Sequence, residues 1–359
     1  MSSGLDSPKP TNIKCPIKTT VRALCLKVPR GEAESTRKKL LELGLLDLGK
    51  RIRRDGEIVL LPVRSQDAGE LGFELVEEEM EEREVAETDY RRVADLPDEV
   101  RARLPTSFDI IGDVAILRLD DDLAEHGPEV GRALMRTFPR LRTVTLDQGV
   151  KGELRVRQLQ VVAGDPRTET VHLEHGVRLL VDPAKVYFNP RLANERMRIA
   201  SLVRDGERVV DMFAGVGPFA VMIAKHARPS VVWAMDLNHD AVEYLRRNIE
   251  LNKVTTVVPL EGDARELLSD IVGVDRIIMN LPHSAREFFA DALTRLNMGG
   301  VIHLYVICER DEIDRIAVDL AVEARGMGVR VCMERIEELK TYSPSMSVFA
   351  LDIRLTDWC

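Results

Sequence analysis

A strand, a glycine-rich turn, a helix and a second strand follow one another between Val209 and Asp236. The first apolar run ends at Asp211, and the turn Phe213-Ala-Gly-Val-Gly217 comes next. Glycine permits the backbone angles of a tight reversal and lets a ligand approach the main chain closely. Pro218 suits the first turn of a helix. This order predicts an α/β fold with a ligand site at the end of its strands.

Two classes of nucleotide cofactor are compatible with this turn. Gly215-Val-Gly217-Pro-Phe-Ala220 satisfies the dinucleotide-binding pattern, which tolerates alanine at its third position. The carboxylate of Asp211 favours the other class, because it would repel a pyrophosphate but attract a sulfonium or an ammonium group. The stretch resembles the first motif of the S-adenosylmethionine-dependent methyltransferases with a Rossmann-like fold, in which Asp236 would hold the ribose hydroxyls. A glycine-rich turn without any ligand is the structural alternative.

Composition bounds the class of protein. The chain has 359 residues, of which 45% are hydrophobic and 31% are charged, so we expect a globular, soluble protein of two or three domains. No apolar run has the length of a membrane span, and the N-terminus lacks a hydrophobic signal core. We therefore expect no membrane contact and a cytoplasmic location. The five cysteines form no Cys-x-x-Cys pair, which argues against a metal site, although a disulfide between two of them stays open: Cys15, Cys25, Cys308, Cys332 and Cys359.

The net charge of −9 argues against a nucleic-acid partner when it is taken alone. Local charge sets the field at a site, however, and the charges here are segregated. Acidic residues are concentrated between Gly69 and Asp89, whereas Lys50-Arg-Ile-Arg-Arg54 is a basic cluster. That cluster is either a solvated surface or a contact for RNA.

Patterning divides the chain into four segments. Residues 1–64 are expected to form an N-terminal αβ module, and residues 65–103 an acidic linker with some helix. Residues 104–182 are expected to form a small α+β RNA-binding module, with a hairpin near Ile110 and a helix from Glu129 to Phe138. Residues 183–359 continue the α/β alternation.

The C-terminal segment has the strand count of a methyltransferase. Seven strands are expected, whereas a nicotinamide enzyme more often has six. After the two already described, the expected strands are 257–263, 274–280, 301–307, 328–334 and 347–355. The fold class is therefore α/β, with a seven-stranded Rossmann-like class I methyltransferase domain preceded by the two smaller modules.

Four stretches together resemble one family. They are Gly152-Glu-Leu-Arg155-Val-Arg, Tyr187-Phe-Asn-Pro-Arg-Leu-Ala-Asn-Glu195-Arg, Asp211-Met-Phe-Ala-Gly-Val-Gly-Pro-Phe and Asn280-Leu-Pro282-His. In these the chain is similar to the archaeal and eukaryotic tRNA (guanine-37 N1) methyltransferases. The resemblance extends from about Leu104 to the C-terminus, and the N-terminal module is similar to that family's tRNA-elbow-reading domain.

The resemblance implies a methyl transfer from S-adenosylmethionine to N1 of guanosine 37. N1 carries a proton, so a general base and a cation near the 6-oxo group are needed. Glu195 matches the base, Arg155 the cation and Tyr187 a residue of the guanine pocket, while Asn280 and Pro282 present the target nitrogen. The expected cofactor contacts are Arg196, Asp211, Phe213, Gly215, Gly217, Asp236, Leu237, Asp263, Ala264 and Asn280. The implied partner is tRNA, contacted at the anticodon loop and the elbow by a monomeric enzyme.

Alternatives remain at two levels. Glu195 lies three residues before Arg198, so an ordinary surface ion pair competes with its role as a base. Asn280-Leu-Pro-His departs from the Asn-Pro-Pro-aromatic motif of amino-directed methyltransferases, which favours a ring nitrogen as the target. An aminocarboxypropyl transferase of wyosine synthesis and a non-catalytic tRNA-binding protein are the competing functions.

Overall fold

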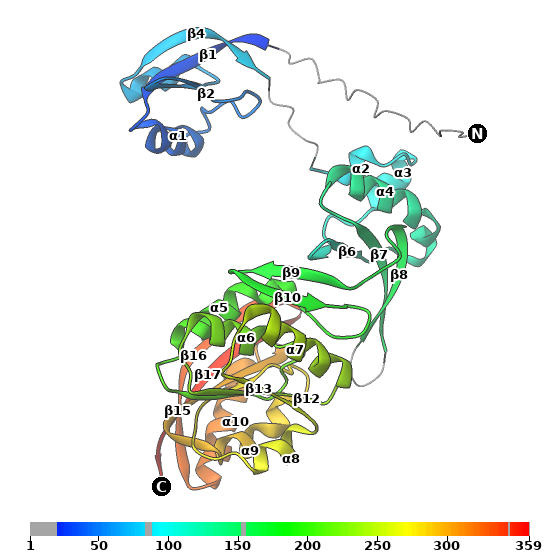
Figure 1. Ribbon diagram of the computed structural model, residues 1–359, viewed down its shortest axis with the longest axis vertical. Coiled ribbons are helices and arrows are strands. Elements are labelled where there is room, and N and C mark those ends of the chain that lie inside the picture. Colours follow the sequence, from blue (N-terminus) through cyan, green and yellow to red (C-terminus); the bar gives the residue numbers. More distant parts are fainter. Residues whose placement is uncertain (1–19, 83–87, 152–155, 344, 359) are drawn as a thin grey trace, which may run out of the picture. The chain divides into compact units, whose positions relative to one another are not determined.

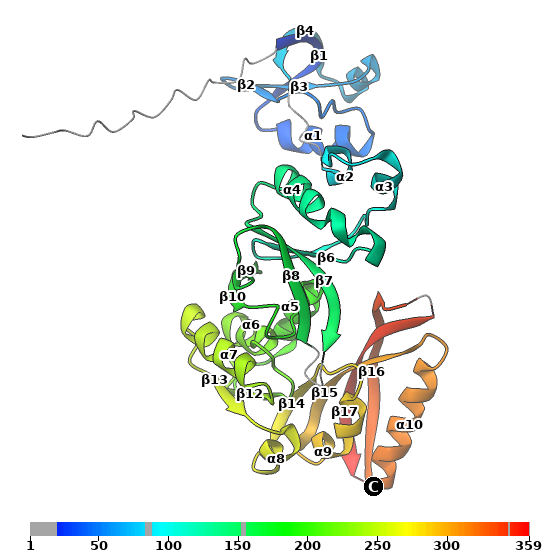
Figure 2. The same ribbon diagram turned by 90° about the vertical axis from the view of Figure 1, so that its right-hand side faces the viewer.

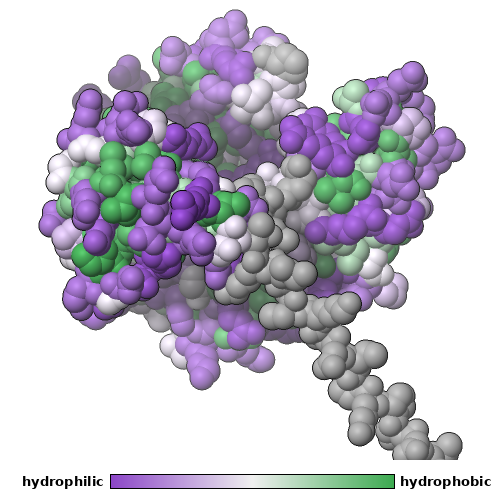
Figure 3. All heavy atoms as spheres, turned by 90° about the horizontal axis from the view of Figure 1, so that it is seen from above, coloured by the Kyte–Doolittle hydropathy of each residue, from purple (hydrophilic) through white to green (hydrophobic). Residues whose placement is uncertain are grey.

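The computed structural model describes residues 20–82, 88–151, 156–343 and 345–358, in two compact units, Met1–Thr88 and Asp89–Cys359 (Figure 1). No helix within these residues is long and apolar enough to cross a membrane. Hydrophilic side chains surround smaller apolar groups on the face drawn in Figure 3. Three of the cysteines lie in the described part, and all three are free thiols: Cys25, Cys308 and Cys332.

The first unit contains a four-stranded antiparallel sheet. Its strand order is β2-β3-β1-β4, with β1 at Thr20–Pro29, β2 at Arg53–Asp55, β3 at Ile58–Pro62 and β4 at Glu74–Glu81. Helix α1 (Ala33–Glu42) and the 3-10 turn η1 (Gln66–Leu71) complete the unit. Leu40 of α1 is fully buried in the core that this sheet forms. The expected αβ module is thus present, but it extends beyond residue 64.

The prediction of an acidic linker at residues 65–103 is wrong, because this segment contains a strand and helices. Its most acidic part is strand β4, which pairs with β1 along its whole length. Val76 and Met80 face one side of β4 and pack with Cys25 and Leu60. Cations of the same sheet offset some of the glutamates: Lys27 of β1 lies 3.6 Å from Glu74, and Arg53 of β2 lies 2.7 Å from Glu78. Alternation of side chains lets a strand this acidic still bury one apolar face.

The second unit begins with helices that the sequence also placed in that linker. Tyr90 of α2 (Tyr90–Val93) is buried, and its hydroxyl donates to the Pro105 carbonyl at 2.6 Å. This part of the unit contains a four-stranded sheet of order β5-β6-β7-β8 and three helices, α2, α3 (Asp98–Arg103) and α4 (Gly127–Thr137). The bounds of its strands and of its 3-10 turn are β5 Asp109–Ile111, β6 Val114–Leu117, η2 Asp121–His126, β7 Thr143–Lys151 and β8 Val156–Gly164. The hairpin near Ile110 and the helix after Glu129 are confirmed.

The hairpin of β9 (Thr170–Glu174) and β10 (Val177–Val181) lies between this sheet and the last one in sequence. Two asparagines of α7 (His239–Asn252) bond to the backbone of β10 as a neighbouring strand would. The Asn248 side chain accepts from Leu180 N at 2.7 Å and donates to Leu180 O at 3.0 Å. Asn252 makes the same two bonds to Arg178, at 2.9 and 2.7 Å. The hairpin is therefore fixed to α7 by side-chain amides.

The largest sheet has the order β13-β12-β11-β14-β15-β17-β16. Its bounds are β11 Arg208–Asp211, β12 Val231–Asp236, β13 Val257–Glu261, β14 Val274–Met279, β15 Leu296–Glu309, β16 Val329–Thr341 and β17 Met346–Trp358. The first five are parallel, and β17 is antiparallel to both of its neighbours. Seven strands agree with the expected fold. The strand expected at 328–334 runs further, to Thr341, through bulges that accommodate its charged residues.

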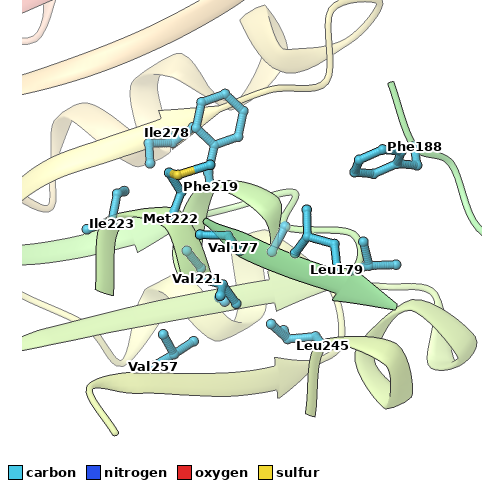
Figure 4. Close-up of a cluster of buried hydrophobic side chains, with 14 of the residues drawn as sticks. Val177, Leu179, Phe188, Phe219, Val221, Met222, Ile223, Leu245, Val257 and Ile278 are labelled. Carbon is cyan, nitrogen blue, oxygen red and sulfur yellow. The ribbon is translucent and has the colours of Figure 1, made fainter. Parts of the chain in front are cut away.

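Two apolar cores cover the faces of this sheet. Phe219 and Met222 of α6 (Pro218–His226) and Leu245 of α7 belong to one core, together with Leu179 of β10 (Figure 4). The other core contains apolar side chains of α8 (Ala264–Ser269), α9 (Phe289–Leu293) and α10 (Ile313–Gly326). Figure 2 shows α10 alongside β16 and β17. The remaining elements are α5 (Ala193–Leu202), η3 (Pro190–Leu192) and η4 (Ala285–Phe288).

Candidate active site

A cavity of about 290 Å³ lies where β11, β12 and β14 end. Most of the residues expected at the site line it: Tyr187, Phe213, Gly215, Asp236, Leu237, Asp263, Ala264, Asn280 and Pro282. The carboxyl ends of parallel strands are the usual ligand site of an open α/β sheet. The sheet thus brings together residues that are almost a hundred positions apart in sequence.

The glycine turn has the geometry that its sequence predicts. Gly215 and Gly217 have φ angles of +56° and +84°, which disfavour any side chain. A Cβ atom at Gly217 would lie 2.3 Å from Leu245 Cδ1, so this glycine lets α6 pack against α7. The amide of Gly215 donates to Asp236 Oδ2 at 2.7 Å, and Asn238 N donates to Oδ1 at 2.9 Å. Asp236 therefore fixes the turn from the neighbouring strand.

Two carboxyl groups lie next to this turn, of which Asp211 is buried and Asp236 is half-buried. Asp211 is fully buried, and neither of its oxygens accepts a hydrogen bond of good geometry from the described residues. Burial, and then the charge of Asp236, raise the pKa of Asp211 to about 8, against the smaller effect of the amides of Phe213 and Ala220. Burial also raises the pKa of Asp236. An acidic, desolvated pair of this kind fits a ligand that carries positive charge.

Part of the cavity wall is apolar. Leu237 is 61% exposed, although it is a large apolar residue, and it lines the cavity. Phe213 and Phe288 meet edge to face, with ring centroids 5.0 Å apart. Asp263 caps α8 by accepting from Arg265 N at 2.8 Å, which places Ala264 at the cavity. These surfaces suit a flat aromatic base such as adenine.

The loop Asn280-Leu-Pro-His283 forms another wall. The Pro282 carbonyl accepts from Ile307 N at 3.0 Å, so the loop is fixed to β15. The ring of His283 contacts that of Tyr342, with centroids 5.8 Å apart. Asn280 directly follows β14 and lines the cavity.

Glu195 lies in the first turn of α5 and is only 7% exposed. Arg198 donates two bonds of 2.7 Å to it, and the Tyr305 hydroxyl donates a third at 2.8 Å. Burial alone would raise the pKa of Glu195, but Arg198, Tyr305 and Arg335 together hold it below its usual value. Glu195 is absent from the described residues that line the cavity. The ion pair weighed as an alternative is present, and it is buried rather than exposed.

The partners of Glu195 belong to a longer buried network. Arg198 donates to Asp352 at 2.7 Å, and Asp352 bonds to His303 Nδ1 at 2.6 Å. Burial lowers the pKa of His303, and Arg276 donates to its other ring nitrogen at 2.5 Å. Burial would raise the pKa of Asp352, yet His303 and Arg198 hold it well below its usual value. The network joins α5 to β15 and β17.

Arg196 also lies behind the cavity. It is 1% exposed, and its Nε donates to Glu174 of β9 at 2.6 Å. Another nitrogen of the guanidinium donates to the carbonyl of Asn189, a residue that lines the cavity, at 3.1 Å. Arg196 therefore supports the loop that carries Tyr187 and Asn189. Arg155 falls outside the described residues, so its expected place near the guanine stays a prediction.

Lys340 and Tyr342 are among the cavity residues that the sequence analysis did not predict. They line the cavity from the end of β16 and just beyond it. Alternation along Glu338, Lys340 and Tyr342 is a strand signal, but the charge density of the segment hides it. Within the described residues, no cluster of His, Cys, Asp and Glu could hold a metal ion.

The sheet order and the ligand cavity define the chain as a class I methyltransferase of Rossmann-like fold. The model of the TRM5/TYW2 methyltransferase domain matches residues 170–332. The TYW2 N-terminal domain matches 93–168, and the tRNA methyltransferase 5 N-terminal domain matches 25–70. The chain is 42% identical to the tRNA (guanine(37)-N(1))-methyltransferase Trm5b of Pyrococcus abyssi, over 93% of this chain and 99% of that protein. The chain belongs to the archaeal and eukaryotic tRNA (guanine-37 N1) methyltransferase family.

Solved structures support the same conclusion. Wild-type Trm5b from Pyrococcus abyssi matches with a TM-score of 0.72, over 93% of this chain and all of that one. A complex of aTrm5 with tRNALeu matches with a TM-score of 0.66 at 34% identity, over 93% of this chain and all of that one. The structure of Methanocaldococcus jannaschii Trm5 with adenosine matches with a TM-score of 0.63 at 34% identity, covering 93% of this chain and 99% of that one.

The methyltransferases of this family use S-adenosylmethionine. The cavity fits that cofactor, because Asp236 in its wall and Asp211 next to the lining residue Met212 suit a cationic ligand, and the apolar wall suits its adenine. Asp236 would hold the ribose, and Leu237, Phe213 and Ala264 would face the base. Asp211, Gly217 and Arg196, which were expected to touch the cofactor, are not among the described residues that line the cavity.

Proposed function

We propose that this chain transfers a methyl group from S-adenosylmethionine to N1 of guanosine 37, next to the anticodon of tRNA. The observation that carries the proposal is a single cavity that combines Asp236, suited to a ribose, with Tyr187 and the Asn280 loop, suited to a base. Identity of 42% to a protein named for this reaction supports the choice of substrate. We further propose that the enzyme is a monomer and works in the cytoplasm.

The chemistry requires a base and a cation. Loss of the N1 proton moves negative charge onto the 6-oxo group of guanine. S-adenosylmethionine supplies the methyl group from its sulfonium. Glu195 would accept the proton, Arg155 would face the oxygen, and Tyr187 would border the base. Asn280 and Pro282 would hold the ring so that N1 points to the methyl group, after the guanosine has left the anticodon stack.

The surroundings of Glu195 suit a residue that must stay ionised. Its lowered pKa keeps the carboxylate ready to accept a proton throughout the neutral range. Arg198 and Tyr305 hold its two oxygens from one side. We propose that binding of the target nucleoside draws the carboxylate from this network toward the cavity, where Asn189 and Leu192 of the same segment already lie.

We propose that the first unit contacts the tRNA elbow. The basic cluster around Lys50 is partly neutralised, since Lys50 pairs with Asp47, Arg51 with Glu81 and Arg53 with Glu78. A hollow on the same unit is lined by Arg30, Arg37 and Arg54, together with Ile52 and with Glu34, which pairs with Arg37 at 2.8 Å. Guanidinium groups beside an apolar floor suit a phosphate and an exposed base.

The function is tested by nucleoside analysis of unmodified tRNA after incubation with the chain and labelled cofactor. Methyl label in 1-methylguanosine at position 37 is the expected result. Label on an aminocarboxypropyl group would instead favour the activity named for a Methanocaldococcus jannaschii relative that is 32% identical over 68% of this chain. Binding of tRNA with no transfer of either label would leave a non-catalytic RNA-binding protein.

A further inference from the structure

Lys340 and Tyr342 extend one face of β16 into the cavity. They are two residues apart, so their side chains project to the same side of an extended chain. Lys340 pairs with Val348 of β17, which also lines the cavity. The amide of Tyr342 donates to the Met346 carbonyl at 2.9 Å, which fixes the turn of the hairpin. The hairpin thus gives the site one cation and one aromatic ring.

The charge of Lys340 has no carboxylate of its own among the described residues. The acid that acts on it is Asp109, which accepts from Arg191 at 2.9 Å and from Arg157 at 3.3 Å. Arg157 also approaches Asp147, at 3.4 Å. Within this cluster, the three cations Lys340, Arg191 and Arg157 face two carboxylates, so one positive charge is in surplus.

Holding Lys340 there costs free energy in the absence of a ligand. Burial lowers its pKa, the charge of Arg191 lowers it further, Asp109 acts in the opposite direction, and Arg157 again lowers it. A partly buried, unpaired lysine in a cleft is more often found at a functional site than in a structural ion pair. The surplus charge is suited to an oxygen that gains negative charge.

Tyr342 offers a flat surface beside that charge. Its side chain is 48% exposed although it lines the cavity, and His283 meets its ring edge to face. Tyr187, at 45% exposure, is a second half-exposed ring of the same cavity. Exposed aromatic rings of this kind stack on nucleobases that have left their helix.

We propose that Lys340 contacts the 6-oxo group of the target guanine and that Tyr342 stacks on the same base. The inference rests on the proposed function and adds two residues to it. When N1 gives its proton to the base, the remaining electron pair is shared between N1 and the 6-oxo oxygen. The charge disappears once the N1–methyl bond has formed. A fixed ammonium beside the oxygen therefore stabilises the negative charge that develops as the proton leaves, which lowers the barrier to removing the proton from N1.

The role of Lys340 is tested by Lys340→Met and Lys340→Arg. The methionine variant should lose about 10²-fold in single-turnover rate at saturating tRNA and cofactor. The arginine variant should recover part of that rate, since it restores the charge with a different shape. Calorimetric affinity for S-adenosylmethionine should stay unchanged in both, which shows that the cavity is intact. Arg330→Met, an exposed cation at the other end of β16, is the matched control and should keep the full rate.

The outcomes separate the inference from the proposed function. A wild-type chain that makes no 1-methylguanosine contradicts the function itself. An active wild type with an equally fast Lys340→Met variant contradicts only the role of Lys340. If Lys340→Met changed only the dissociation constant of tRNA, Lys340 would be a contact to a tRNA phosphate, and the inference would also be wrong.

Stacking is tested without catalysis. A tRNA that carries 2-aminopurine at position 37 serves as the probe. The fluorescence of this base should be quenched when the tRNA binds to the wild type and to Tyr342→Phe, because both proteins offer an aromatic ring on which it can stack. Tyr342→Ala should leave the bound base brighter. Equal fluorescence in all three complexes would remove Tyr342 from the base-binding wall.

Discussion

At the residue scale, Glu195 shows how little a side chain's neighbours in sequence reveal about its role. A spacing of three residues to Arg198 predicts an ion pair, and that pair forms. Burial, and the Tyr305 hydroxyl 110 positions away, turn it into an ordered network. A carboxylate in such surroundings is ionised at neutral pH. To act as the general base it must exchange its hydrogen bonds from Arg198 and Tyr305 for one from N1 of the guanine.

We expect Glu195→Gln to lose most of the single-turnover rate while it still binds S-adenosylmethionine, because an amide cannot accept the N1 proton. Rapid-quench kinetics and calorimetry measure the two quantities. Glu243→Gln removes an exposed glutamate that pairs with Arg246 three residues on, and it serves as the control. A Glu195→Gln enzyme with near wild-type rate across neutral pH would show that another group is the base.

Asp211 gives a pH dependence of known sign. Its pKa rises from an ordinary 3.8 to about 8 on folding, so the unfolded chain releases this proton more easily. The contribution of Asp211 is greatest below pH 4 and is lost as the pH rises toward 8, at up to about 1.4 kcal/mol per pH unit. Asp211→Asn should therefore raise the melting temperature of the cofactor-free chain near pH 8 and change it little near pH 4. The same variant should weaken binding of the cationic cofactor, and an unchanged melting curve at both pH values would contradict the shifted pKa.

At the scale of elements, side-chain amides join the β9–β10 hairpin to the cofactor fold. Asn248 is fully buried, bonds to both backbone groups of Leu180, and donates to the Val216 carbonyl in the glycine turn at 2.9 Å. One residue of α7 therefore stabilises both β10 and the turn beside the cavity.

We expect Asn248→Ala to destabilise the chain by about 2–4 kcal/mol, because buried backbone groups lose their partners at about 1–3 kcal/mol each. Urea denaturation measures the loss. Asn194→Ala, on the exposed side of α5, should change stability by less than about 0.5 kcal/mol. Equal stability of the two variants would mean that water replaces the amide without cost.

At the scale of the whole molecule, the chain consists of two units, each with cores of its own. The boundary at Thr88 follows from packing, since Tyr90 and Ala94 belong to the core of the second unit. A chain that began at Leu96 would lose both residues.

A chain that begins at Asp89 should fold, bind S-adenosylmethionine and keep its rate at saturating tRNA. It should bind complete tRNA more weakly, with a smaller salt dependence, and discriminate poorly between complete tRNA and an anticodon stem-loop. Methylation of both substrates by both chains at several salt concentrations tests this. A strong remaining preference of the shorter chain for complete tRNA would exclude an elbow-reading role for the first unit.

The sequence by itself determined the seven strands of the C-terminal segment, the glycine turn with its two aspartates, and the family. These features follow from short-range rules of periodicity, backbone angles and motif spacing, which a linear sequence carries in full. Residues 74–81 are so rich in charge that the sequence did not predict a strand there. The strand forms nonetheless, because pairing with β1 and a nearby arginine outweigh the low strand propensity of glutamate.

Only the tertiary structure decided which polar groups meet. Asp352 is 154 positions from Arg198 and forms a partly buried pair with it, and Glu174 is 22 positions from Arg196 and forms a buried pair with it. Lys340 enters the cavity only because bulges and pairing with β17 set the register of β16. Such contacts depend on how sheets and helices pack, and a buried charge finds its partners in space rather than along the chain.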